Sequence, residues 1–324
     1  MVAVTETAPK AMKPRPASDA QPSVGVVLAT HHRPELMRRA LASILAQEYA
    51  GPVEVVVVFD RSAPDLSLPQ EFAARPGRTV RVLTNERTPG LAGARNTGVL
   101  ALATELAAFC DDDDVWLPGK LAAQVDRLRA HPDASFVTTA MRVDVEGRST
   151  VRLAGRSEVT IDDLARSRMA MLHSSSFLFR RTSMVDGFGL VDETVPQSMG
   201  EDWDLLIRAA REHAVQHVDE PLVGVLWGRT SFFNDAWHAK NLAHAWLLER
   251  HPEMGADPVG AALLHGKLAF GLAATGQRTQ ALRSARRAVR ARWREPRPWL
   301  ALLVVAGVPG SAIQHLLNRR GYGI

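Results

Sequence analysis

Short apolar runs alternate with amphipathic segments over the first third of this 324-residue chain. Val24 to Ala29 and Val53 to Phe59 have the length and composition of buried strands, and the second contains no turn residue. Val80 to Leu83 and Leu106 to Cys110 continue the series. Because the connections are short and helical segments lie between the runs, the pattern predicts an α/β fold with a mostly parallel central sheet covered by helices on both faces.

Three helical segments are predicted around these strands. Pro34 begins the first, Gly90 to Gly98 begins a second that extends to about Ala103, and Asp202 to Glu212 forms a third. The apolar side chains expected to face inward are Leu36, Ala40, Ile44 and Leu45 in the first and Leu205, Leu206 and Ala209 in the third.

The second half of the chain has a more mixed pattern. Strands are expected near 134–139 and 142–153 and at Phe177 to Phe179, and beyond about residue 236 the pattern is helical to the end. We therefore predict three parts: a disordered tail over 1–22, an α/β domain over 23–235, and a helical extension over 236–324.

The cysteine content and the apolar runs indicate where in the cell the protein is located. A single cysteine, Cys110, excludes an intramolecular disulfide and is typical of a reducing compartment. Residues 1–22 lack the apolar segment of a secretory signal, and the longest apolar run, Trp299 to Val308, is too short to span a bilayer. We expect a cytoplasmic protein that is free or peripheral at the inner face of the membrane.

Peripheral contact is suggested by residues 278–297, which contain eight arginines and one glutamate in a chain of net charge +4. One helical face holds Ala281, Leu282, Ala285, Ala288 and Val289, and arginines occupy the rest. Such a helix either lies on an anionic membrane or packs on the protein with a solvated arginine face. Nucleic acid is not the expected partner, because no aromatic platform accompanies the arginines.

Four consecutive aspartates, Asp111 to Asp114, follow the apolar run that ends at Cys110, and polar residues also follow two other predicted strands at Thr30 to Arg33 and at Asp60. Ligands of such sheets bind beyond the carboxyl ends of the strands. Carboxylates suit Mg²⁺ or Mn²⁺, and alternate residues point the same way, so Asp111 and Asp113 are expected to converge. The alternative is a solvated loop that favours a helix beginning near Pro118.

Several other segments have two interpretations each. Arg95 opens a helix and suits a phosphate or a nucleobase edge, or it pairs with an aspartate. Gly200 to Asp204 supplies either a helix cap or a general base. His173 to Ser176 is either an acceptor contact or an exposed turn, and the residues Trp227, Arg229 and Ser231 either close over a diphosphate or form a surface loop.

In their order these segments resemble family 2 of the inverting glycosyltransferases, over about residues 23–235. Thr30 and Arg33-Pro34 match its opening, and Gly90 to Gly98 matches its glycine-rich segment ending in Ala-Arg-Asn. Asp111 to Asp114 matches its Asp-x-Asp-Asp motif, and Gly200 to Asp204 matches its Glu-Asp helix start. One motif differs from the family's pattern, because the chain has Phe59-Asp60-Arg61-Ser62 where the family has Asp-Asp-Gly-Ser.

The resemblance implies a GT-A fold and assigns the residues. Donor binding would involve Thr30, Arg33, Asp60, Arg95, Asp111 and Asp112, with Thr30 and Asp60 at the nucleobase and Asp111 at the ribose. Asp113 would bind Mg²⁺ or Mn²⁺, and Asp202 would be the catalytic base. Candidates for acceptor or diphosphate contacts are Glu201, Trp203, His173, Trp227 and Arg229.

The implied reaction is metal-dependent, inverting transfer of a hexose from a nucleotide-diphosphate sugar to an acceptor hydroxyl. UDP is the default nucleotide, with dTDP or GDP as alternatives. The acceptor is expected to be a glycan or a lipid-linked sugar in the synthesis of cell-surface polysaccharide or glycoconjugate.

Two other functions fit part of the pattern. Phe109 to Val115 also resembles the apolar strand and Asp-x-Asp-x-Val of haloacid-dehalogenase-type phosphatases, although that class does not need three strands before its nucleophile. A non-catalytic sugar-nucleotide-binding module would bind the donor without turning it over.

Overall fold

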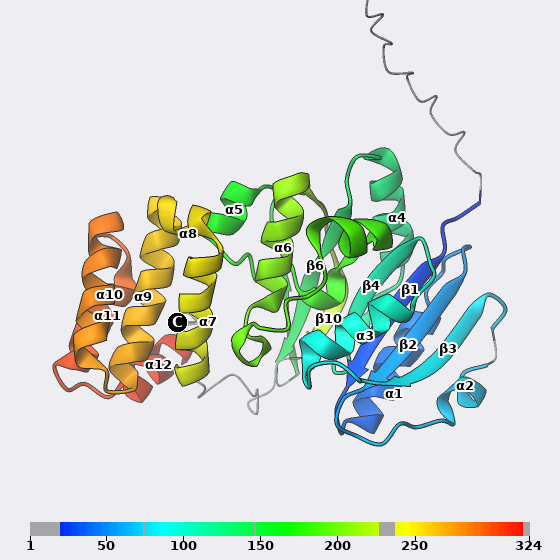
Figure 1. The fold of residues 1–324 in the computed structure, drawn as a ribbon, viewed down its shortest axis with the longest axis horizontal. Helices are drawn as coiled ribbons and strands as arrows, with labels where there is room; N and C mark the ends of the chain where they lie inside the picture. The colour runs from blue at the N-terminus through cyan, green and yellow to red at the C-terminus, as the bar shows by residue number, and fades with distance from the viewer. Residues whose placement is uncertain (1–19, 74, 146, 227–236, 320–324) are drawn as a thin grey trace, which may run out of the picture.

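The computed structural model describes residues 20–73, 75–145, 147–226 and 237–319, and every structural statement here concerns these residues. The predicted tail therefore lies almost wholly outside them, as do Trp227, Arg229 and Ser231. One ten-stranded sheet with the order β3-β2-β1-β4-β9-β6-β10-β5 forms the centre (Figure 1), with β7 paired to β6 and β8 paired to β10.

The first four strands are parallel and in register. Val24 lies opposite both Val53 and Leu106, and at the other end Thr30 lies opposite Phe59. The carboxyl ends of these strands therefore meet at one edge of the sheet. Their bounds are β1 Val24–Thr30, β2 Val53–Phe59, β3 Arg78–Thr84 and β4 Leu106–Asp111.

The other strands make the sheet mixed. β9 runs antiparallel to both β4 and β6, whereas β10 is parallel to β6. The predicted α/β class with a mostly parallel sheet is confirmed. The bounds are β5 Val115–Trp116, β6 Phe136–Val145, β7 Arg148–Arg152, β8 Glu158–Val159, β9 Leu178–Arg180 and β10 Val215–Leu226.

Two strand predictions were wrong in detail. The break expected between residues 139 and 142 lies after Val145, where Gly147 adopts a φ of 78° that favours glycine in the turn. The long strand β10 was not among the predicted strands, because polar residues interrupt its apolar pattern; its pairing with β6 shifts register between Val218 and Pro221.

Helices cover both faces of the sheet. α1 Pro34–Leu45 and α4 Lys120–Ala130 pack on one face, and α3 Leu91–Ala101 and α6 Glu201–Glu212 pack on the other. In α1 the predicted inward residues Ala40, Ile44 and Leu45 are buried, whereas Leu36 is only half-buried and Met37 is buried beside it. The shorter elements are α2 Leu68–Glu71, α5 Ile161–Arg166, η1 Ser174–Ser176, η2 Ser183–Phe188 and η3 Pro196–Ser198.

The C-terminal helices extend from one end of the sheet region (Figure 1). Leu247, Met254 and Leu264, from the first three of them, lie in the same apolar core as Trp203 of α6. The last three helices pack on α9 around Phe270. The bounds are α7 Trp237–Arg250, α8 Pro252–Ala256, α9 Pro258–Ala274, α10 Arg278–Ala291, α11 Pro296–Val305 and α12 Gly310–Arg319.

The basic helix α10 packs through alanines. Ala281, Ala285 and Ala288 are buried, but Leu282 is 45% exposed, so its predicted place on the packed face was wrong. Leu282 lies one position further round the helix, on the arginine side. Within the described residues, no helix has both the length and the apolar character needed to cross a membrane.

Candidate functional site

The acidic run begins at the last residue of β4. The carboxylate of Asp111 accepts hydrogen bonds from Arg95 Nη2 at 2.6 Å and from Ser174 Oγ at 2.9 Å. Its backbone N–H donates to Ser175 Oγ at 2.9 Å. The arginine comes from α3 and the serines from η1, so three segments far apart in the sequence meet at this carboxylate.

The next two aspartates face the loop between β1 and α1. Asp112 accepts hydrogen bonds from Thr30 Oγ1 at 2.9 Å and Arg33 Nη1 at 3.2 Å, and the same Arg33 nitrogen lies 2.8 Å from Asp113 Oδ2. Burial and repulsion from the three other aspartates raise the pKa of Asp113 to about 6, and Arg33 offsets this only in part. The run therefore has more negative charge than its side-chain partners balance.

Asp114 turns back toward Asp111, since its N–H donates to the Asp111 carbonyl at 3.2 Å. Its carboxylate accepts a hydrogen bond from Ser175 Oγ at 2.5 Å and lies 3.2 Å from Nδ1 of His173. Burial lowers the pKa of His173, but the Asp114 and Asp111 carboxylates outweigh burial and raise it to about 9. The position accordingly favours positive charge.

Asp111, Asp114 and His173 each offer one ligand atom, and these atoms lie within 4.8 Å of one another. A set of two carboxylate oxygens and one imidazole nitrogen fits a divalent cation such as Mn²⁺ or Mg²⁺. We expected Asp111 and Asp113 to converge, but the chain turns after Asp111 and brings the carboxylate of Asp114 beside Asp111 instead. The role of Asp113 as a metal ligand stays a prediction.

Asp60, one residue beyond β2, is held in a fixed orientation. It accepts hydrogen bonds from Asn85 Nδ2 at 2.8 Å, the Gly90 N–H at 3.1 Å and Arg61 Nε at 2.9 Å. Burial raises its pKa, but these hydrogen bonds outweigh burial and lower it, so the carboxylate stays ionised. Arg61 has a φ of 46°, which explains why glycine suits this position of the motif.

Arg95 is buried between two carboxylates. It donates hydrogen bonds to Asp111 and, at 3.0 Å, to Glu201 Oε1. Of the two interpretations given for Arg95, the structure therefore supports the one in which it pairs with an aspartate. Burial and the neighbouring Asp202 raise the pKa of Glu201 to about 7. Arg95 thereby connects the end of β4 with the start of α6.

Asp202 lies at the start of α6, after Gly200 with its φ of 92°. The N-cap residue Gly200 offers no side-chain cap, but Asp202 Oδ1 accepts a hydrogen bond from the Trp203 N–H at 2.8 Å and so satisfies a donor of the first turn. Arg168 Nη2 donates to Asp202 Oδ2 at 2.6 Å. Burial raises the pKa of Asp202, but Arg168 outweighs burial and lowers it, so the carboxylate is ionised at neutral pH. The sequence contained no signal for Arg168, which comes from the segment after α5.

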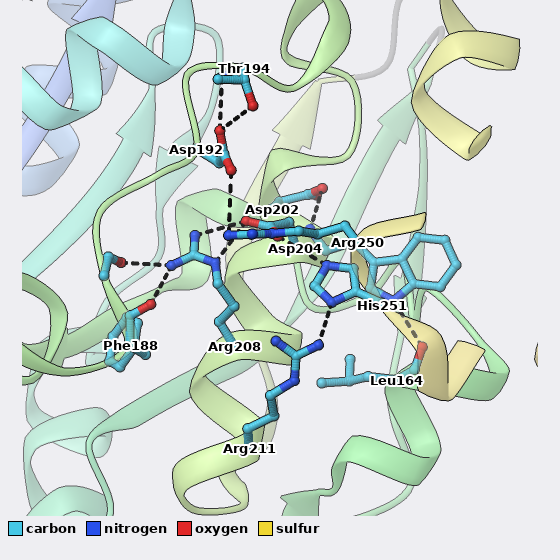
Figure 2. A network of polar contacts seen from close by, with 12 residues as sticks. Leu164, Phe188, Asp192, Thr194, Asp202, Asp204, Arg208, Arg211, Arg250 and His251 are labelled. Carbon is cyan, nitrogen blue, oxygen red and sulfur yellow. Dashed lines mark hydrogen bonds and ion pairs between the residues drawn. The ribbon is translucent and has the colours of Figure 1, made fainter. Parts of the chain in front are cut away.

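The neighbours of Asp202 anchor α6. Trp203 is buried and its indole N–H donates to the Leu164 carbonyl at 2.9 Å, so the structure places Trp203 in the core and not at an open surface. Figure 2 shows Arg208 and His251 grouped around the fully buried Asp204. Arg208 Nε lies 2.9 Å and His251 Nε2 3.0 Å from its carboxylate oxygens.

A second unexpected residue, Glu193, lies before α6. It accepts hydrogen bonds from Asn96 Nδ2 at 2.7 Å, Arg87 Nε at 2.5 Å and the Thr88 N–H at 3.2 Å. Burial raises its pKa, but these donors outweigh burial and lower it to about 2. Glu193 thus ties the irregular segment before α6 to α3 and to the loop after β3.

Comparisons with known proteins identify the family and the fold of this chain. The model of glycosyl transferase family 2 matches residues 25–188. The succinoglycan biosynthesis protein ExoO of Rhizobium meliloti is 32% identical over 204 residues, which cover 60% of this chain and 57% of ExoO. The Escherichia coli protein WfgD, a UDP-Glc:α-D-GlcNAc-diphosphoundecaprenol β-1,3-glucosyltransferase, is 30% identical over 32% of this chain and 40% of its own.

Among solved structures, S. aureus TarS (residues 1–349) in complex with UDP-GlcNAc has a TM-score of 0.61 at 17% identity, over 93% of this chain and 92% of that one. The fold is therefore of the GT-A type. Since the family model matches half of the sequence, the chain belongs to glycosyl transferase family 2. It spans little more than half of ExoO and less than half of WfgD.

Proposed function

We propose that the protein is a metal-dependent, inverting glycosyltransferase that moves a hexose from a nucleotide-diphosphate sugar to an acceptor hydroxyl. The observation that carries the proposal is the joining of Asp111 and Asp202 through Arg95 and Glu201 at the carboxyl edge of the sheet. A site for donor phosphate and metal and a site for proton removal then lie side by side. Family membership favours this chemistry over a phosphatase.

The nucleotide would lie across the ends of β1, β2 and β4, with Thr30 and Asp60 at the base, Asp111 and Asp112 at the ribose, and Arg33 close to the phosphates. UDP is the proposed nucleotide, supported by the UDP-GlcNAc bound to TarS and the UDP-Glc in the name of WfgD. The alternative nucleotides are dTDP and GDP.

The proposed metal is Mg²⁺ or Mn²⁺. Asp111, Asp114 and His173 would hold it, with Asp113 once released from Arg33. A bound divalent cation would act as a Lewis acid and template that offsets the charge on the leaving diphosphate. The electrostatics support this fit, because the aspartates raise the pKa values of Asp113 and His173 together, and a bound cation would replace the proton that this negative charge favours on His173.

In the proposed reaction Asp202 accepts a hydrogen bond from the acceptor hydroxyl and removes its proton as the oxygen attacks the anomeric carbon. Attack from the face opposite the nucleotide inverts the anomeric configuration. Arg168 positions the carboxylate and keeps it ionised. We expect the Asp202→Asn variant to lose transfer by about 10²–10⁴-fold while it binds UDP as tightly as the wild type.

A screen of nucleotide sugars with Mn²⁺ or Mg²⁺ tests the proposal, with nucleotide release and UDP binding measured on both proteins. Full activity in Asp202→Asn would remove the assigned base. Donor binding without turnover in the wild type, with every acceptor class tried, would instead favour a binding module. Hydrolysis of simple phosphate esters without any nucleotide sugar would favour the phosphatase.

We propose a glycan or lipid-linked acceptor from cell-surface polysaccharide synthesis, and peripheral contact with an anionic membrane through α10. The outer face of this helix carries Arg283, Arg286, Arg287 and Arg290, and nearby Trp293 and Trp299 are 65% and 47% exposed. Arginines with exposed tryptophans suit an anionic interface.

Sedimentation with anionic vesicles tests this contact. Replacing Arg283, Arg286 and Arg287 together by glutamine should leave the protein in the supernatant, because each basic residue contributes about 1 kcal/mol near such a surface. Undiminished sedimentation of that variant would exclude α10 as the contact.

A further inference from the structure

A second group of basic side chains lies between the C-terminal helices and the start of α6. Lys240 and His244 come from α7, Lys267 from α9, Arg297 from α11, and Arg168 from the segment after α5. We call these five residues the basic cluster. Its link to the proposed active site is Arg168, which donates to Asp202 at 2.6 Å.

The members of the basic cluster lie close enough to repel one another. Burial and, next, the nearby charges of Arg297, Arg168 and Lys240 together lower the pKa of Lys267 to about 7. Burial also lowers the pKa of His244 far below its ordinary value, with Lys267 as the next largest cause. Within the described residues, Glu295 pairs with Arg297 and Asp202 pairs with Arg168, whereas no carboxylate pairs with Lys267.

Polar atoms in and beside the cluster also lack partners. Lys267 makes no hydrogen bond or ion pair with any residue that the structure describes. His244 Nδ1, Arg297 Nε and both amide atoms of Asn241 are buried without a hydrogen-bond partner in the described chain. A buried polar atom without a partner destabilises the folded protein, because it has lost its hydrogen bonds to water.

A helix interface selected only for packing would place apolar side chains here, as α7 and α9 do one turn away with Leu247 and Leu264. Concentrated positive charge with unfilled hydrogen-bonding capacity is instead what an anion site looks like before its ligand binds. Phosphate fits best, because it accepts several hydrogen bonds from lysine and arginine at once.

We propose that the basic cluster binds a phosphate group of the acceptor and so places the acceptor hydroxyl at Asp202. This inference rests on the proposed glycosyl transfer and assigns the acceptor a chemical class, a phosphorylated glycan or a sugar linked to a lipid through phosphate. The donor phosphates belong beside the acidic run, on the other side of the ion pair between Arg95 and Glu201.

The test measures binding of two monophosphates, glucose 1-phosphate and farnesyl phosphate, by calorimetry with the wild-type protein saturated with UDP and Mg²⁺. Lys267→Met keeps the length of the side chain but removes its charge, and Lys267→Arg keeps the charge. We expect Lys267→Met to weaken binding of at least one probe by about tenfold or more, and Lys267→Arg to change it by less than about threefold. UDP affinity should not change in either variant.

Arg148→Gln, which removes an exposed charge from β7, is the matched control and should leave both probe affinities unaltered. His244→Asn gives a second variant of the cluster should Lys267→Met fail to fold. Tighter binding of farnesyl phosphate indicates a lipid-linked acceptor, tighter binding of glucose 1-phosphate indicates a soluble one, and either supports the proposal.

Three results overturn it: no binding of either probe to the UDP-saturated wild type, equal probe binding in Lys267→Met and the wild type, and an equal loss in Arg148→Gln. Phosphate binding is measured without turnover, so it stands apart from the test of Asp202. If Asp202→Asn keeps full activity while Lys267→Met loses phosphate affinity, the base assignment fails and the phosphate site remains.

Discussion

At the scale of single residues, Glu193 makes a prediction about acid stability. Its pKa lies near 2 in the folded protein and near 4.5 in an unfolded chain, so its stabilising effect is complete above about pH 4.5 and is lost as the pH falls through 2. We expect Glu193→Gln to lower the free energy of unfolding by about 1–3 kcal/mol at pH 7. Urea unfolding at several pH values measures this.

The difference between Glu193→Gln and the wild type should shrink steadily from pH 5 toward pH 2, because both side chains are then neutral. The exposed neighbour Glu86 supplies the control, and Glu86→Gln should change little at any pH. A constant difference across the range would mean that the carboxylate charge contributes nothing.

The sequence predicts the residues of the acidic run and of the α6 start, because their position after apolar strands or before a helix is visible in one dimension. It could not indicate Arg168 or Glu193, which come from irregular segments and reach the site only through tertiary contacts. The sequence also does not show where a strand ends. Asp111 and Asp113 would point the same way in a continuous strand, but the chain turns at Asp112, so they do not converge as expected.

At the scale of elements, α3 approaches β1 closely because residue 98 is glycine. A Cβ there would lie 2.3 Å from Val27 Cγ1. We expect Gly98→Ala to destabilise the protein by about 1–3 kcal/mol through overpacking and to weaken UDP binding, since α3 carries Arg95. Thermal unfolding and UDP titration check both effects. Leu100→Ala, on the exposed side of α3, should show neither, and an unchanged Gly98→Ala protein would mean that the helix shifts freely.

At the same scale, the polar network of Figure 2 holds α6 against α7 and α8. Arg211 donates to His251 Nδ1 at 2.8 Å, so Nε2 of this histidine carries the proton directed at Asp204. Removing the carboxylate leaves buried donors without an acceptor, and we expect Asp204→Ala to cost about 3–5 kcal/mol. Chemical unfolding measures the loss. A cost below about 1 kcal/mol would show that apolar packing alone holds the helix.

For the molecule as a whole, the sequence predicts helices beyond residue 236 but not their two kinds of packing. Leu247 and Met254 extend the core of the sheet region, whereas α10 to α12 form a smaller cluster on α9. Side chains that complete a distant core have the same apolar pattern as those of a separate unit, so the sequence cannot distinguish them.

This division predicts different effects of shortening the chain. A protein that ends at residue 277 keeps the shared core and should retain cooperative unfolding and UDP binding. A protein that ends at residue 235 exposes the core around Trp203 and should aggregate or unfold without a cooperative transition. Calorimetry of the two proteins compares them. Equal, cooperative transitions in both would mean that α7 to α9 are dispensable for the core.

The central claim is that the acidic run and Asp202 together carry out metal-dependent sugar transfer. The most direct measurement is the rate of UDP release from UDP-sugars in the presence of phosphorylated acceptors, with Mn²⁺ and then with excess EDTA. The account predicts release that requires the metal and the acceptor and that falls by at least about 10²-fold in Asp202→Asn. Release that persists in EDTA, or that is unaltered in this variant, would contradict it.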